Sequence, residues 1–292
     1  MEAVTVNETK KSGFFSNLAN PIIRKMEKKA DFAASATASY GGIAMKTLFF
    51  LLITLAAAFA FLALHGVLVS AAGTGVLHAV QEGESSVYDL TTTVPELIIV
   101  IVATLIALIT PFLAFFIRST IPVTGTLYTV SQGIMIGFIT TALATQYKWL
   151  SLLAAVLTAV LVGVMLFIYA KRIIKVNATF RKIIIALFAT IVISGIVFFV
   201  LNLIPFTRNL MTGINEIVSN PIFSIILSVI FIIIAALFML ADFDAIERCV
   251  ENGMDKKYEW MAAWGLAYTI LYVYFKILRL LIMAASKSKS RN

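Results

Sequence analysis

Seven long apolar runs, separated by short polar segments, constrain the fold of this chain more than any other feature of its sequence. A helix needs ~20 apolar residues to cross a hydrocarbon core. We expect membrane spans at Thr47–Ala71, Pro95–Ile117, Gly125–Ala144, Leu150–Ala170, Lys182–Leu203, Pro221–Ala241 and Tyr258–Met283. Hydrophobic residues fill 61% of the 292 positions and charged residues only 13%, about half the charged share of a soluble domain. The chain is therefore predicted to be an all-α membrane protein, a seven-transmembrane-helix bundle.

The connections between these runs are too short to hold a second folded domain. We predict a cytoplasmic polar or amphipathic leader over 1–45, a seven-helix membrane domain over 46–285 and a basic tail over 286–292. In the leader, Asn20–Ala34 mixes lysines with apolar residues. This segment is either a short interfacial helix on anionic lipid or a solvated tail. No signal peptide is expected, because an extended polar leader precedes the first apolar run.

The distribution of basic residues predicts the orientation in the membrane. Basic residues collect in cytoplasmic loops of membrane proteins. Here they gather in the leader and between the fourth and fifth spans, at Lys10, Lys11, Arg24, Lys25, Lys28, Lys29, Lys46, Lys171, Arg172, Lys175, Arg181 and Lys182. The loop Val76–Val94 has acids but no Lys or Arg. We therefore expect a protein of the cell membrane with its N-terminus in the cytoplasm.

The basic tail does not follow this rule. An odd number of spans sends Lys287, Lys289 and Arg291 to the outside. Either the seventh segment crosses the membrane and the tail is an exception, or the segment enters and returns. We favour crossing, because late charges weigh less than early ones in setting topology.

Several classes of protein lack support in the sequence. The single Cys249 excludes an internal disulfide, and the two histidines, His65 and His78, form no metal-ligand pattern. Neither histidine is expected near an acid within the spans, and no nucleotide-binding glycine motif is present. We expect no catalytic activity, no cofactor, no bound metal and no nucleic-acid partner. A secondary transporter is also disfavoured, because no acid lies in the middle of a span.

Two carboxylates, Asp242 and Asp244, follow the sixth apolar run directly. Burying an ionised side chain in hydrocarbon costs several kcal/mol unless it is paired or wetted. The pair therefore marks either a functional site or the point where the helix leaves the lipid, and these alternatives are about equal. On a helix the two side chains lie ~200° apart, and Asp244 is one turn before Arg248. We predict an inward, proton-sensing role for Asp242 and a capping or pairing role for Asp244.

The seventh run carries a polar stripe. One face of the expected helix presents Gly265, Thr269, Tyr272, Lys276 and Arg279. A membrane helix turns such a face toward other helices or water, so we expect this helix to pack centrally with the stripe inward. Lys276 and Arg279 either extend to the interface or pair with Glu96 or the acidic outer loop. In the third run, Gly133 and Gly137 predict a close helix–helix contact.

The C-terminal part of the chain resembles the Bax inhibitor-1 family, in its bacterial branch. The resemblance is carried by A-D-F-D-A-I-E-R-C-V-E-N-G, E-W-M-A-A-W-G-L and Y-F-K-I-L-R-L-L, in that order. Weaker similarity lies in N-P-I-I-R at Asn20–Arg24, in Gly41-Gly42 before Lys46-Thr47-Leu48, and in Leu127-Tyr128, Gln132-Gly133 and Gly137. The similar region runs from about Asn20 to Leu281.

The resemblance implies a seven-helix fold with the last helix central and a pH-dependent leak of Ca2+. In such relatives a carboxylate of helix six shares a proton with one of helix seven, and an arginine at the end of helix two latches to the first. Asp242 matches the helix-six carboxylate by its spacing to Ile246, and Arg118 matches the latch. The helix-seven position holds Thr269, and Lys276 stands where many bacterial-branch members have Glu. The two-acid switch is thus absent in its usual form.

Two functions of different classes follow. The first is a pH-gated leak of Ca2+ or another cation, such as H+, with Asp242 as proton sensor and Arg118 as latch. The second is a non-conducting regulator that binds another membrane protein, such as a protease or stress-response partner. The missing second acid and Lys276 both favour the second function. Under either hypothesis the chain works within the lipid bilayer.

Overall fold

The computed structural model describes residues 37–72, 77–79, 87, 90–174, 176–207, 212–214 and 220–289. Several predictions fall outside these residues: the interfacial segment Asn20–Ala34, the acids of the loop Val76–Val94 and the last residues of the tail. The side chains of His78 and Arg118 are also outside the described part.

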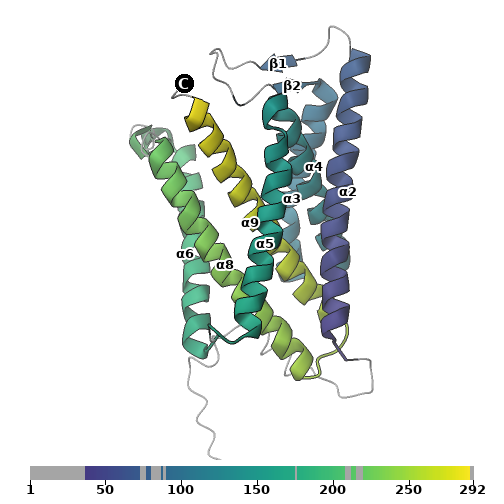
Figure 1. Ribbon diagram of the computed structural model, residues 1–292, viewed down its shortest axis with the longest axis vertical. Coiled ribbons are helices and arrows are strands. Elements are labelled where there is room, and N and C mark those ends of the chain that lie inside the picture. Colours follow the sequence, from purple (N-terminus) through teal and green to yellow (C-terminus); the bar gives the residue numbers. More distant parts are fainter. Residues whose placement is uncertain are drawn as a thin grey trace, which may run out of the picture.

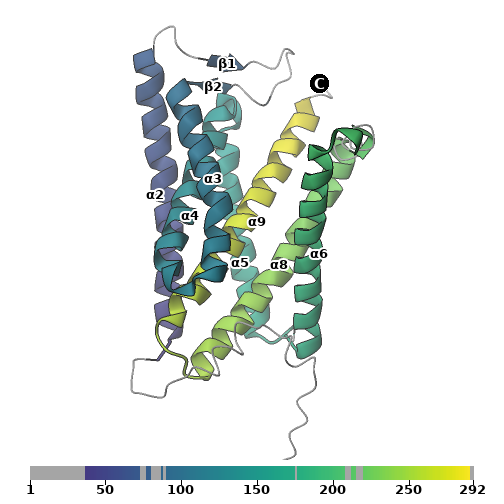
Figure 2. The same cartoon turned by 180° about the vertical axis from the view of Figure 1, so that it is seen from behind.

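Each of the seven predicted spans falls on a long helix, as Figures 1 and 2 show. The helices are α2 (Tyr40–Ala72), α3 (Val94–Phe116), α4 (Ile121–Ala142), α5 (Trp149–Ala170), α6 (Ala178–Leu203), α8 (Pro221–Glu251) and α9 (Tyr258–Lys289). Short 3-10 turns lie at η3 (Arg118–Thr120), η4 (Thr145–Tyr147) and η5 (Pro205–Thr207). The strands β1 (Leu77–Ala79) and β2 (Leu90–Thr92) form an antiparallel pair between α2 and α3.

Local capping residues explain where several helices begin. Asn220 accepts from the backbone N–H of Ile222 at 3.0 Å, and Pro221 occupies the first turn of α8. Asn177 accepts from the N–H of Phe180 at 2.8 Å at the start of α6. These side chains satisfy backbone donors that the first helical turn leaves without partners.

Several helices are longer than the predicted spans, among them α2 and α8. The helix α2 begins at Tyr40, before the predicted start at Thr47. The helix α8 continues to Glu251, so Asp242 and Asp244 lie inside the helix, beyond the predicted end of the span at Ala241. The length of an apolar run indicates only the part of a helix that suits lipid. The helix α8 ends further on, at Asn252 and Gly253, and Gly253 has a φ of 60° that favours glycine.

Six of the helices, α2, α3, α5, α6, α8 and α9, are long and apolar enough to cross a membrane. The helix α4 has 22 residues but is richer in threonine, serine and glycine, and it does not meet the same criterion of composition. Large apolar side chains remain exposed along one face of α3, at Ile98, Ile101, Leu105, Leu108 and Phe112. Such a face suits lipid, and the chain is an all-α integral membrane protein.

Two glycines of α4 allow close packing against a neighbouring helix, as predicted, and the structure identifies that helix as α2. A Cβ at Gly133 would overlap the carbonyl oxygen of Thr54 and the Cβ of Ala57. A Cβ at Gly137 would lie 2.9 Å from the carbonyl oxygen of Ala58. Small residues at a membrane interface let two backbones approach, and these two positions confirm the predicted contact.

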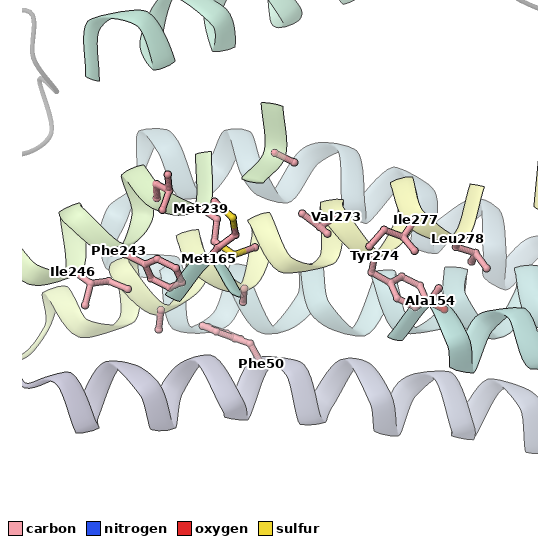
Figure 3. Packing of buried hydrophobic residues seen from close by; sticks show 14 of the residues in the cluster. Phe50, Ala154, Met165, Met239, Phe243, Ile246, Val273, Tyr274, Ile277 and Leu278 are labelled. Atoms are coloured by element: carbon pink, nitrogen blue, oxygen red, sulfur yellow. The ribbon is translucent and has the colours of Figure 1, made fainter. Parts of the chain in front are cut away.

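The helix α9 packs against α2, α4, α5 and α8. Half of its most apolar stretch is buried inside the protein, a larger share than in any of the other five candidate spans. Figure 3 shows Val273, Tyr274, Ile277 and Leu278 of α9 among buried side chains of the neighbouring helices, including Phe50 of α2. Of the predicted polar stripe of α9, Thr269 is buried, Gly265, Tyr272 and Lys276 are partly buried, and Arg279 is exposed.

Candidate functional site

Asp242 of α8 is hydrogen-bonded to Thr269 of α9. The hydroxyl Oγ1 of Thr269 lies 2.6 Å from Oδ2 of Asp242 and 3.2 Å from the carbonyl oxygen of Gly265. Thr269 is buried, and Asp242 is partly buried. The inward acid predicted from the sequence thus faces the polar stripe of α9.

Asp244 faces a different helix. Its Oδ2 lies 2.7 Å from Nη2 of Arg248 and 3.2 Å from Nη1 of Arg181 on α6. The predicted pair with Arg248 is confirmed. Asp242 and Asp244 therefore do not share a site, because the helical turn points one toward α9 and the other toward α6.

A third acid of α8, Glu247, extends the group of charges around Asp244. The hydroxyl of Tyr169 on α5 and the guanidinium of Arg172 both donate to its carboxylate. The hydrogen bond to Glu247 raises the pKa of the Arg172 guanidinium above its ordinary value. Glu247 was not predicted as a site residue, since its partners are far away in the sequence. Together with the Asp244 pairs, these contacts join α5, α6 and α8 at one end of the bundle.

The predicted latch, Arg118, begins η3 between α3 and α4. Its side chain is outside the described part of the structure, so its pairing with Asp242 stays a prediction. The backbone N–H of Thr120 bonds to the carbonyl of Ile117 at 3.1 Å, which closes the turn that holds this residue.

Lys276 lies on aromatic rings. Its Nζ is 4.5 Å from the ring centroid of Phe231 on α8 and 5.0 Å from that of Tyr272 on its own helix. The side chain is half-buried, whereas Arg279 one turn further is exposed. The predicted alternative of a pair between Lys276 and Glu96 is wrong, because Glu96 is bound by other residues.

Glu96 is fully buried at the start of α3. Its Oε2 accepts from the backbone N–H of Thr93 at 2.7 Å and from the hydroxyls of Thr93 and Thr92 at 3.0 and 3.2 Å. Its Oε1 lies 2.6 Å from Nδ1 of His65 on α2. The expectation that neither histidine lies near an acid is therefore wrong for His65. A capping box at the N-terminus of α3 positions the carboxylate, and packing of α2 against this end of the bundle brings the imidazole to it.

A third buried carboxylate, Glu259, joins the first turns of α9 and α2. It is paired with Lys46, and its Oε1 accepts from the N–H and hydroxyl of Ser39 at 2.9 and 3.1 Å. Any side chain at Gly42 would overlap this carboxylate. The pair of Lys46 with Glu259 was not predicted, although Glu259 begins the E-W motif of the resemblance. The signal in the sequence was Gly42, since a glycine is required where the Glu259 carboxylate lies against α2.

These features define an α-helical integral membrane protein with a carboxylate between two of its helices, a buried ion pair of Lys46 and Glu259 at one end and a buried contact of Glu96 with His65 at the other. The chain matches the family model described as Bax inhibitor 1 like over residues 20–286, and it belongs to this family. Comparisons with curated proteins and with solved structures found no match.

Proposed function

We propose that this protein is a pH-sensitive leak for Ca2+ or another cation, such as H+, gated by Asp242 at the cytoplasmic end of α8, the sixth of the seven long helices. In this proposal all seven long helices cross the cytoplasmic membrane of a bacterium, α9 is the central helix and the N-terminus is cytoplasmic. Arg118 is the latch that holds Asp242 in the closed state. The protein has no catalytic role.

The hydrogen bond between Thr269 and Asp242 carries the proposal. It places a titratable carboxyl between two helices that pack along much of their length inside an apolar bundle. A neutral carboxyl is tolerated there, whereas a charged one requires water, a cation or a basic partner. A change in the charge of Asp242 therefore favours either a closed, dry contact or a hydrated, open one.

We expect the transition between the closed and open states to depend on one proton, that of Asp242, and not on two. The hydroxyl of Thr269 stands where the resemblance implies a second carboxylate, and a hydroxyl does not titrate in this range. Two coupled acids titrate in two steps that belong to the pair. A lone acid gives one step, so the flux should follow a one-proton pH profile.

Liposome flux tests the proposal. The purified protein is reconstituted with a Ca2+ dye in one preparation and a Na+ dye in another, and flux is measured across pH. We expect pH-dependent flux that Asp242→Asn renders independent of pH. The matched control is Asp255→Asn, in the exposed turn between α8 and α9, which should leave the profile unchanged. Flux absent at every pH refutes the leak, and a pH profile unchanged in Asp242→Asn refutes gating by Asp242.

A second candidate function is that of a non-conducting regulator that binds another membrane protein. Lys276 favours it, because a cationic side chain inside the bundle opposes the passage of cations. Affinity capture from native membranes should then yield one stoichiometric membrane partner while the liposomes show no flux. Capture of no partner speaks against this alternative.

A further inference from the structure

Two polar faces meet along the contact between α8 and α9. We call this contact the α8–α9 seam. Two contacts fix its register: Thr269 bonds to Asp242, and Lys276 lies on Phe231. The helices are antiparallel, as Figures 1 and 2 show, so the part of α8 before Phe231 faces the part of α9 after Lys276. On α8 that part includes the buried serines Ser224 and Ser228, which follow the same helical face.

Lys276 is the cation inside this seam. Its ammonium lies over two rings within 5.0 Å of their centroids, an arrangement that stabilises a positive charge. Among the side chains that the structure describes, Lys276 forms no ion pair. Its charge is therefore compensated by aromatic faces and not by a carboxylate among those residues.

The position of Lys276 relative to Asp242 is set by helical geometry. Seven residues separate Lys276 from Thr269, which corresponds to ~10 Å along the helix axis. A cation that moves along the seam between Asp242 and the Ser224 end of α8 must pass this ammonium. Charge repulsion by a fixed cation is twice as large for a divalent ion as for a monovalent ion. For a cation held beside Asp242, ~10 Å from the ammonium, at an effective dielectric constant of ~20, the extra repulsion of a divalent ion corresponds to roughly tenfold discrimination.

We propose that Lys276 sets the ion selectivity of the α8–α9 seam and disfavours divalent cations relative to monovalent cations. This inference rests on the proposed leak function and specifies which cations it passes. The aromatic rings of Phe231 and Tyr272 keep the ammonium in the seam, where an exposed lysine would turn to water.

Selectivity in liposomes tests the inference. The ratio of Ca2+ to Na+ flux is measured for the wild type, Lys276→Gln, Lys276→Met and Lys276→Arg at one pH. We expect the ratio to rise roughly tenfold in the Gln and Met variants, and to stay near the wild-type value in the Arg variant. The matched control is Arg279→Gln, which removes an exposed cation from the same helix face and should change the ratio less than about twofold. Circular dichroism and thermal melting in detergent identify any variant that fails to fold.

The outcomes separate this inference from the leak itself. Flux that depends on Asp242 but keeps the same ion ratio in Lys276→Gln and Lys276→Met overturns the role of Lys276 and leaves the leak intact. Ca2+ flux that appears only when Lys276 is replaced supports Lys276 as the excluding charge. No flux in the wild type or in any folded Lys276 variant overturns both proposals.

Discussion

The hydroxyl of Thr269 lies 2.6 Å from the Asp242 carboxylate, across the contact between α9 and α8. The carboxylate thus has a polar but non-titrating partner in the apolar interior of the bundle. A single acid in this position changes the local charge by one unit when it gains or loses a proton. The partner residue therefore determines how many protons the site exchanges.

Replacing the partner by a second acid should change the number of protons. In Thr269→Asp, two carboxyls face each other across the seam, and their protonation becomes coupled. We expect the pH profile of flux to change from one step to two. The measurement is liposome flux at closely spaced pH values, fitted for the number of steps.

The control for this prediction is Thr269→Ser, which keeps the hydroxyl and should keep the one-step profile. A one-step profile in a folded Thr269→Asp protein would show that Asp242 does not act through the α8–α9 contact.

Features that depend on nearby residues could be predicted from the sequence. The helices followed from apolar run length, the close helix contact at Gly133 from small residues four apart, and the pair of Asp244 with Arg248 from one helical turn. Each of these signals lies within a single helix. The contact of Asp242 with α9 followed from the stripe of α9 and the family resemblance.

Pairs between distant helices could not be predicted in the same way. His65 and Glu96 are 31 residues apart, Arg181 and Asp244 are 63 apart, and Lys46 and Glu259 are 213 apart. Periodicity tells which face of a helix is polar, but it does not tell which other helix that face meets. For this reason all three pairs were missed, whereas the helices that carry them were found.

Gly133 should be a sensitive packing position. In Gly133→Ala the new Cβ overlaps the backbone of α2 at Thr54, so the helices must separate or shift. Overpacking of this kind costs roughly 1–3 kcal/mol. We expect a lower thermal midpoint in detergent. Gly163→Ala on α5 is the control, since no heavy atom beyond the adjacent turns of its own helix lies within 4 Å of its new Cβ, and it should be neutral or stabilising by up to about 1 kcal/mol. Equal midpoints for the two variants would contradict the close contact.

The turn between α8 and α9 should weaken in acid. The backbone N–H of Lys257, at 3.0 Å, and its ammonium hold the pKa of the Asp255 carboxyl below its ordinary value. A lowered folded pKa means that the stabilisation is present above the unfolded pKa of ~3.9 and is lost as the pH falls through the folded pKa. Hydrogen exchange reports this loss at the Ala38 amide, which bonds to the carbonyl of Met254 at 2.7 Å.

For this turn, we expect the protection of Ala38, corrected for the intrinsic exchange rate, to decrease below about pH 4. In Asp255→Asn the protection should be lower at neutral pH and should lose this pH dependence. An unchanged pH dependence in that variant would assign the effect to another acid.

The pair of Lys46 and Glu259 should stabilise the protein more than any exposed ion pair. The Glu259 side chain is 0% exposed and that of Lys46 is 17% exposed, so Lys46→Met leaves a buried carboxylate without its cation. Removal of one partner of a buried pair costs roughly 3 kcal/mol or more. We expect a large decrease in thermal midpoint for Lys46→Met, partly restored by the second change Glu259→Gln, because the neutral amide no longer requires a cation.

The matched control is Lys257→Met in the exposed pair with Asp255, which should shift the midpoint little. If the double variant is no more stable than Lys46→Met alone, the lysine acts through its contact with the Trp260 ring and not through charge.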